Sequence, residues 1–407
     1  MRSKLFKNIQ SAIIIKSLSA FIGFIITFFV GYYFGASEAG KYFYFYSLTL
    51  LLSGFVRLGL DNFTLKEMPS YYTKGELSNV SQHFSISITI ICLSSIFLSL
   101  VMLLFSTSIG INFKCIYAIT FLPFAIVAYI GIFYQSLGQV TKGLLYSVLI
   151  PQVCMAIFIV SFSNNVENVM YFFASLYYLL LLGLVILLHK YFIRFQFKKI
   201  LTTLKRSKSF VLISLFGIVN VNYAPLIISH FLSFSDNALF TVSLKVATIN
   251  VFILSALNSV IAPKFSLLHS TGDLAGVKNL AKKSTRFMAV FSFPLFLVMV
   301  LFPEMILTFF GKEYNTSEGV CCLQILAFSQ FINVSTGATS YLLQMVGLSF
   351  LFSKLLIGLT TIAILIALAF VDAFGLLGVV SVVALSSILL NVASLISIKI
   401  KLNFWMI

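Results

Sequence analysis

Three charged side chains lie within or beside long apolar stretches of the sequence: Arg57, Asp61 and Lys245. Arg57 and Asp61 are four residues apart, so on a helix they share one face and are expected to form an ion pair. Lys245 shares a helical face with Thr241 and Thr248. A cation held among apolar residues attracts phosphate, a lysine as a point charge and an arginine through a two-pronged fork. These side chains are the first candidates for binding an anionic group such as a phosphate or pyrophosphate.

Each of these charges also has a plainer interpretation. Lys245 can extend along its helix to the polar surface of a membrane instead of facing a cavity. Arg57 and Asp61 can form a local ion pair that binds no ligand. Lys16, which opens another apolar stretch, has the same two interpretations as Lys245.

Two further apolar stretches carry uncharged polar residues at helical spacing. Gln330 and Asn333 begin one polar stripe, and Asn220 and Asn222 lie in the other stretch, with Asn222 turned away from the face of Asn220. The remaining members are Gly337, Ser340, Tyr341 and Gln344 in the first stretch and Tyr223 and His230 in the second. Such side chains can hydrogen-bond between membrane helices, or they can bind sugar hydroxyls in a cavity.

The composition of the whole chain explains why these residues stand out. Of its 407 residues, 60% are hydrophobic and 9% are charged, whereas soluble domains carry roughly 25% charged residues. A chain with this small number of polar groups cannot cover a water-facing surface with them. We therefore expect an all-α integral membrane protein. The net charge of +16 then indicates basic cytoplasmic loops and not nucleic-acid binding. The five cysteines have no CxxC spacing, so neither a metal site nor a disulfide framework is expected.

Twelve stretches of at least fifteen residues contain no Asp, Glu, Lys or Arg. A membrane-spanning helix needs ~20 mostly apolar residues, so each stretch is interpreted as one span. The stretches are 17–37, 42–56, 77–113, 115–141, 143–166, 168–189, 209–235, 246–263, 287–303, 319–353, 355–371 and 373–398.

Twelve spans place both termini on the same side of the membrane. In this arrangement 22 of the 27 Lys and Arg residues lie on the side of the termini, and seven of the 11 acids lie on the other side. The positive-inside rule therefore predicts cytoplasmic termini. The connections between spans leave no room for a soluble catalytic domain, which favours a transporter over an enzyme. No cleaved signal peptide is expected.

We predict opposite signals from topology reporters fused after Phe195 and after Asp236, because the seventh span separates these positions. The same signal at both positions would contradict the arrangement of twelve spans.

A short motif, G-[ED]-L-x-x-V, occurs twice, at Gly75–Val80 and at Gly272–Val277. The first copy follows the second span and the second copy follows the eighth. The sequence therefore predicts two six-helix halves, 1–190 and 209–407, around a central cleft, as in many transporters. The basic, amphipathic stretch 191–208 between them is expected to be a cytoplasmic linker held by anionic lipids, with docking of a partner protein as the alternative.

The stretch Leu239–Phe265, which runs into the second copy of the motif, resembles the region after helix 8 of Wzx-type flippases. These proteins form the polysaccharide-export branch of the MATE-like MOP superfamily. Phe133–Gly138 is similar to the family's aromatic-Gln-Gly motif, although Ser136 replaces the usual glycine. The resemblance covers essentially the whole chain. An acid often seen in the family's helix 7 corresponds to Asn222 here, which argues against proton coupling through an acid on this helix.

The resemblance implies a MATE-like fold and a flippase that works by alternating access in the bacterial inner membrane. The implied substrate is an undecaprenyl-pyrophosphate-linked oligosaccharide repeat unit of O-antigen, other lipopolysaccharide or capsule, moved from the cytoplasmic to the periplasmic leaflet. The family's cationic lumen maps onto Lys245 and Arg57. No cofactor is implied, and the coupling ion, H⁺ or Na⁺, stays open. A glycan polymerase and a chain-length regulator are the implied protein partners.

Three other functions fit the same composition. A multidrug exporter of the same superfamily would need a buried carboxylate, and the sequence places none deep in a span. A lipid-linked glycan polymerase or ligase would need a large periplasmic loop, whereas the longest such connection is about 303–318. The relatives of a lipid II flippase usually have fourteen spans, so a count of the helices would distinguish such a protein from the favoured flippase.

Overall fold

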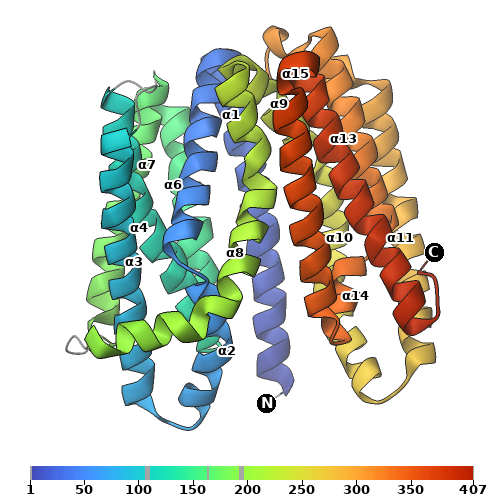
Figure 1. Ribbon diagram of the computed structural model, residues 1–407. Coiled ribbons are helices and arrows are strands. Elements are labelled where there is room, and N and C mark those ends of the chain that lie inside the picture. Colours follow the sequence, from blue (N-terminus) through green and yellow to red (C-terminus); the bar gives the residue numbers. More distant parts are fainter. Residues whose placement is uncertain (1, 106–110, 163–164, 192–196, 407) are drawn as a thin grey trace. The chain divides into compact units, whose positions relative to one another are not determined.

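The computed structural model describes residues 2–105, 111–162, 165–191 and 197–406. These residues form helices joined by short turns, and they contain no β-strand (Figure 1). The α-helices are α1 (Arg2–Val56), α2 (Leu60–Thr73), α3 (Leu77–Phe105), α4 (Ile111–Ser136), α5 (Val140–Leu144), α6 (Ile150–Phe162), α7 (Val166–Leu188), α8 (Phe197–Phe231), α9 (Phe234–Ala247), α10 (Ile249–Ser270), α11 (Leu274–Leu301), α12 (Pro303–Thr308), α13 (Ser317–Ser335), α14 (Thr339–Met345) and α15 (Ser349–Leu402). A π-helical turn, η1 (Leu145–Leu149), joins α5 to α6, and two short 3-10 helices are η2 (His189–Tyr191) and η3 (Lys312–Tyr314).

Nine helical segments of the described chain are long and apolar enough to cross a membrane. Two of these segments hold two helices each, because α1 is interrupted at Gly35 (φ 74°) and α15 at Gly375 (φ 57°). Glycine adopts such positive φ values without the steric cost that other residues meet. Counting these helices separately and adding the α9–α10 pair gives twelve. The predicted all-α membrane fold is therefore confirmed, and the chain is a multi-pass membrane protein.

The first of two compact units consists of residues 1–26 and Phe45–Asn222. Helix α4 is its centre and packs against α2, α3, α5 and α7. Aromatic side chains fill the space around α4: Phe84 and Phe133 lie 4.4 Å apart between ring centroids, and Phe45 and Phe173 lie 5.5 Å apart. The packing of such large rings contributes van der Waals attraction between helices whose backbones are already hydrogen-bonded.

The second compact unit consists of Thr27–Tyr44 and Tyr223–Ile407. Its central helix is α13, which packs against α9, α11 and α15. One cluster of buried side chains includes Phe265, Met288, Leu342, Leu343 and Ile398. Helices α4 and α13 are each the fourth membrane helix of their predicted half, so the same helix is central in both units.

The paired turns give further support to an internal repeat. In the turn from α2 to α3, Gly75 has φ 75° and Glu76 N–H donates to the Tyr71 carbonyl (3.0 Å). In the turn from α10 to α11, Gly272 has φ 76° and Asp273 N–H donates to the Leu268 carbonyl (2.9 Å). The two copies of the sequence motif thus form the same turn.

A second pair of turns includes the end of the Phe133–Gly138 motif, which was not predicted to have a partner in the second half. Gly138 (φ 77°) follows α4 and Gly347 (φ 84°) follows α14. In both turns the glycine N–H donates to the carbonyl of a glutamine three residues earlier, Gln135 or Gln344. The halves 1–190 and 209–407 stay a prediction, which these two pairs of turns support.

The two compact units differ from the two predicted halves at one place. The hairpin Thr27–Tyr44 belongs to the first predicted half but packs within the second unit. Asn237 of α9, which is fully buried, donates its side-chain N–H to the Gly40 carbonyl (3.1 Å). Gly40 must lack a side chain, because a Cβ there would lie 1.7 Å from the Phe234 carbonyl oxygen.

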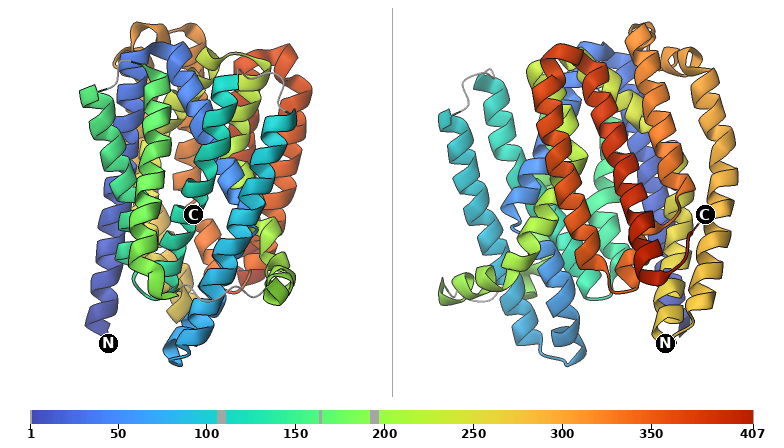
Figure 2. Two further views of the ribbon diagram at one scale, coloured as in Figure 1. Left: turned by 90° about the vertical axis from the view of Figure 1, so that its left-hand side faces the viewer. Right: turned by 45° about the vertical axis from the view of Figure 1, so that its right-hand side comes forward.

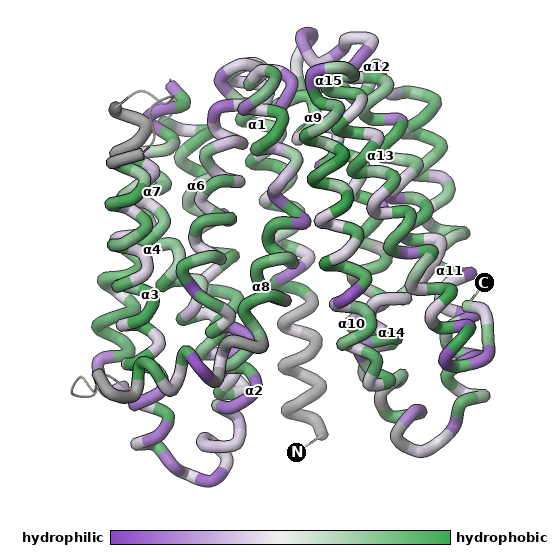
Figure 3. The backbone as a smooth tube through the Cα atoms, viewed as in Figure 1, coloured by the Kyte–Doolittle hydropathy of each residue, from purple (hydrophilic) through white to green (hydrophobic). Residues whose placement is uncertain are grey.

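The predicted linker 191–208 is in part helical. Residues 192–196 lie outside the described part of the chain, and α8 begins at Phe197 and continues without interruption to Phe231. Its sequence from Phe197 to Lys208 contains no Gly or Pro, which allows a helix to form. The first part of α8 runs across the direction of the other helices of its unit in Figure 1 and in the right-hand view of Figure 2. Polar residues gather at helix ends, as in the turn between α2 and α3 (Figure 3).

Candidate functional site

The first unit contains a broken helix at the residues that the sequence singled out. Helix α1 ends at Val56 and α2 begins at Leu60. Between them Leu58 and Gly59 have φ values of 44° and 70°. A positive φ is unfavourable for leucine, and such outliers often mark functional sites.

The close approach of α8 explains the glycine at this break. A Cβ on Gly59 would lie 2.7 Å from the Val211 nitrogen and 2.8 Å from the Phe210 carbonyl carbon. Next to it, Asn62 donates its side-chain N–H to the Ser214 hydroxyl at 2.9 Å. The break is therefore held by backbone packing and by a side-chain hydrogen bond to α8.

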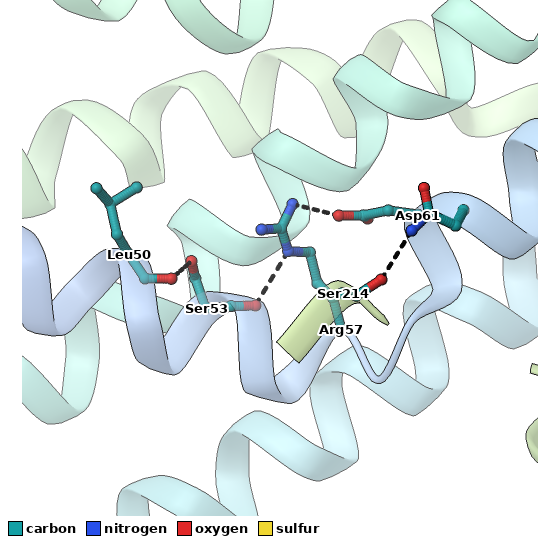
Figure 4. Close-up of polar contacts among 6 residues, drawn as sticks. Leu50, Ser53, Arg57, Asp61 and Ser214 are labelled. Atoms are coloured by element: carbon teal, nitrogen blue, oxygen red, sulfur yellow. Dashed lines mark hydrogen bonds and ion pairs between the residues drawn. The ribbon is translucent and has the colours of Figure 1, made fainter. Parts of the chain in front are cut away.

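Arg57 and Asp61 stand on the two sides of this break (Figure 4). Arg57 Nη1 lies 2.8 Å from Asp61 Oδ2, which confirms the predicted ion pair. Arg57 Nε also donates to the Ser53 carbonyl at 3.0 Å. The two charged side chains are mostly enclosed, with 13% and 21% of their surfaces exposed.

The pair lies directly after the apolar segment, which ends at Val56. The sequence placed Arg57 and Asp61 near the cytoplasmic end of the second span, where the charge-free stretch ends. The structure continues beyond them as α2, which has 14 residues, or about 21 Å of helix. The pair thus lies within a long broken helix, because charged residues in α2 interrupt the apolar sequence without ending the helix.

A second polar group lies beside this pair, on α2, α3 and α4. The Tyr129 hydroxyl, which is on a fully buried side chain, lies 3.1 Å from the Thr64 hydroxyl and also bonds to Ser87. Ser87 lies 3.4 Å from Nδ1 of His83. These residues could not be predicted from the sequence, because single polar residues on three separate helices leave no periodic pattern.

In the second unit, Lys245 lies in the last turn of α9. The predicted single span is divided there, since α10 begins at Ile249. The backbone carbonyls at the end of a helix favour a nearby cation, and the Lys245 side chain is exposed. Thr241, on the same face, donates to Asn237 Oδ1 at 3.3 Å. Ligand binding by Lys245 stays a prediction.

The polar stripe of the tenth span forms a chain of amide groups within the second unit. Asn333 donates to Gln330 Oε1 (3.2 Å) and accepts a hydrogen bond from Asn391 Nδ2 (3.2 Å). Thr339 in turn donates to Asn391 Oδ1 at 3.4 Å. These contacts join α13, α14 and α15. The plainer interpretation, hydrogen bonding between helices, therefore describes Gln330 and Asn333 in this state, and Asn391 is a member that the sequence analysis missed.

The remaining candidate residues are separate from these two groups. Asn222 is buried, and its side-chain N–H donates to the Ile218 carbonyl one turn earlier on α8 (2.9 Å). Asn220 is half-buried on the same helix, and Lys16 of α1 is exposed. Their predicted roles in ligand binding stay predictions.

Comparison with solved structures relates this arrangement of helices to known proteins. An inward-facing multidrug resistance MATE family transporter of the MOP superfamily matches with a TM-score of 0.68 and 14% identity, over 96% of this chain and 98% of that chain. An outward-facing structure of such a transporter matches with a TM-score of 0.64 and 13% identity, over 98% and 95% of the two chains. The chain has the MATE transporter fold.

Three further results concern a family model, the curated proteins and another solved structure. A family model described as "Polysaccharide biosynthesis protein" matches residues 168–319, which confirms the resemblance to polysaccharide-export proteins. No curated protein matches the chain significantly. A MOP superfamily transporter from Pyrococcus furiosus, described as having a binding pocket of reverse polarity, has a TM-score of 0.60 and 13% identity over 98% and 95% of the chains.

Proposed function

We propose that the protein is a flippase for undecaprenyl-pyrophosphate-linked oligosaccharide repeat units, such as those of O-antigen or capsule. It would move them from the cytoplasmic to the periplasmic leaflet of the bacterial inner membrane. The observation that carries this proposal is Arg57, a mostly enclosed guanidinium at the break between the membrane helix α1 and α2. Broken helices commonly form the substrate sites of transporters, and arginine suits phosphate. The match to a polysaccharide biosynthesis family supports a glycan as part of the substrate.

The charges of each unit support an anionic substrate. The first unit offers Arg57 and the second offers Lys245, and only one carboxylate, Asp61, lies beside either of them among the described residues. Uncharged amides such as Gln330 and Asn333 suit sugar hydroxyls if their mutual hydrogen bonds open. Alternating access fits a fold whose relatives include inward-facing and outward-facing structures.

Export of cationic drugs is the second candidate, because similar structures are multidrug transporters and Asp61 is a partly enclosed carboxylate. Its ion pair with Arg57 disfavours this candidate. A cationic drug that approached Asp61 would meet the arginine, and like charges repel at close range.

A flipping assay separates the two candidates. Vesicles that contain the purified protein and a fluorescent polyprenyl-pyrophosphate sugar should expose the label to an added quencher faster than protein-free vesicles. Drug-resistance measurements in a host that lacks its own exporters should show no gain. Drug resistance without lipid flipping would contradict the flippase proposal.

We predict that Lys245→Ala lowers surface glycan about tenfold or more in a complementation assay, while Lys245→Arg keeps part of the activity. A hydrogen bond to a charged group contributes about 1.5–3 kcal/mol, which corresponds to at least that factor. Lys354→Ala is the control, because Lys354 is an exposed lysine of the same unit that lies over the Phe350 ring. If Lys245→Ala accumulates normally and still gives wild-type levels of surface glycan, Lys245 is not part of the site.

A further inference from the structure

Two contacts fix the Arg57 guanidinium, and they come from the two sides of the break. From α1, the Ser53 carbonyl accepts a hydrogen bond from Nε at 3.0 Å. From α2, Asp61 Oδ2 lies 2.8 Å from Nη1. An arginine side chain has several rotatable bonds, so a free guanidinium samples many orientations. Because this guanidinium is held at both Nε and Nη1, the planar group keeps one orientation (Figure 4).

These two contacts leave one edge of the guanidinium open. Figure 4 shows the Asp61 oxygen on the side of Nη1 that faces away from Nη2. Nη1 carries two hydrogens, so its second hydrogen points along the edge that Nη1 shares with Nη2. Nη2 has no hydrogen-bond partner in the described part of the chain, and it is not fully buried. The Nη1–Nη2 edge can therefore donate two parallel hydrogen bonds to a ligand.

An edge with two parallel N–H donors matches a group that has two free oxygens on one atom, as a phosphate has. Each phosphorus of a lipid-linked pyrophosphate keeps two oxygens that bridge to no other atom. A lysine offers only a point charge and cannot provide such an edge. The open edge of Arg57 thus favours binding of one phosphate group of the pyrophosphate through a pair of hydrogen bonds.

The Asp61 carboxylate has no other contact that would explain its place beside an anion site. Its second oxygen, Oδ1, is buried and has no hydrogen-bond partner in the described part of the chain. Its negative charge repels a nearby phosphate, and this repulsion is stronger in a partly enclosed site than in water. A carboxylate here favours phosphate binding only if its contact with Nη1 is what presents the open edge.

We infer that Asp61 is a positioning residue, which together with the Ser53 carbonyl presents the Nη1–Nη2 edge of Arg57 to one phosphate of the substrate. This inference rests on the proposed function and names the group that recognises the pyrophosphate. Asp61 does not touch the ligand, and its ion pair with Arg57 stays intact when the ligand binds. Because Ser53 lies on α1 and Asp61 on α2, the orientation of the edge depends on the angle at the break.

Charge and positioning predict different effects when Asp61 is replaced. If Asp61 acts only through its charge, every neutral residue in its place removes the same repulsion and strengthens phosphate binding equally. If Asp61 positions Arg57, only a residue that still accepts a hydrogen bond from Nη1 keeps the affinity. Asp61→Asn keeps an acceptor oxygen, whereas Asp61→Ala removes it. The two variants are equally neutral, so the difference between them measures positioning alone.

The experiment is calorimetry of farnesyl pyrophosphate binding to the purified full-length protein, at one pH and one salt concentration. Asp61→Asn should bind at least as tightly as the wild-type protein. Asp61→Ala should bind about threefold to tenfold more weakly than Asp61→Asn, because binding must then restrict a free guanidinium. Arg57→Lys should bind about tenfold more weakly than the wild-type protein, because one of the two hydrogen bonds is lost. In the Arg57→Lys background the two Asp61 variants should bind equally, because a lysine has no edge to orient.

Two further variants complete the design. Glu38→Gln removes the acid of the Lys41–Glu38 pair and should bind as the wild-type protein does. Asp61→Ser takes the place of Asp61→Ala if that variant does not fold, since its hydroxyl is one bond shorter than a carboxylate and does not reach Nη1. Equal affinities of Asp61→Asn and Asp61→Ala, or the same difference between them in the Arg57→Lys background, would overturn the inference and leave the proposed function standing. Failure of the wild-type protein to bind the ligand would overturn both.

Discussion

Replacing Arg57 by glutamine is expected to lower glycan export about tenfold or more and to destabilise the first unit. The ligand loses its arginine, and a hydrogen bond to a charged group contributes about 1.5–3 kcal/mol. Asp61 loses the partner that lies 2.8 Å away, and breaking a mostly buried pair by removing one member costs about 3–5 kcal/mol. Complementation for surface glycan and thermal unfolding in detergent measure the two effects.

The double variant Arg57→Gln with Asp61→Asn separates stability from binding. It removes both charges, so the cost of an unpaired carboxylate disappears, and the unfolding temperature should return close to that of the wild-type protein. Export should stay low, because no cation remains for the pyrophosphate. If export recovers together with stability, Arg57 has only a structural role, and the proposed site is wrong.

The spacing of Arg57 and Asp61 was enough to predict their ion pair, because contacts four residues apart on a helix are local. The break between them was not predicted. Leu58 does not favour a positive φ, and Gly59 is one of 22 glycines, most of which lie within or between helices without such a break. What imposes the break is the α8 backbone at Phe210 and Val211, which is distant in sequence.

The number of helices and the all-α fold were predictable for a different reason. Each membrane-spanning helix requires a long apolar run, and such runs can be recognised in the sequence. Charge-free runs do not mark every helix: α2 and α9 hold Asp61, Lys66 and Lys245, so such runs leave out α2 and most of α9.

The polar contacts between helices could be predicted only in part. Gln330 and Asn333 share a helical face, so their own hydrogen bond follows from spacing. Asn391 is 58 residues from Asn333, and Tyr129 is 65 residues from Thr64. Such pairs depend on which helix faces which, and one sequence does not contain that information.

Replacing Gly59 by alanine is expected to be far more damaging than the same change at Gly138. Both glycines have a positive φ, 70° and 77°, so both alanines meet the same backbone cost of about 1–2 kcal/mol. Only at Gly59 would the added Cβ also collide with backbone, 2.7 Å from the Val211 nitrogen, whereas at Gly138 nothing lies within 4 Å. Backbone cannot rotate away as a side chain can, and overpacking adds about 1–3 kcal/mol.

Thermal unfolding of the two variants in detergent measures this difference directly. Gly138→Ala should lose about 1–2 kcal/mol, and Gly59→Ala should lose about 2–5 kcal/mol. Gly59→Ala should also weaken pyrophosphate binding, because the break directly after Arg57 must rearrange when α2 moves away from α8, whereas Gly138→Ala should bind as the wild-type protein does. Equal losses of stability in the two variants would mean that α8 does not press on the break. Arg57 and Asp61 would then be held by their own ion pair alone, and the broken helix would not be a fixed frame for the site.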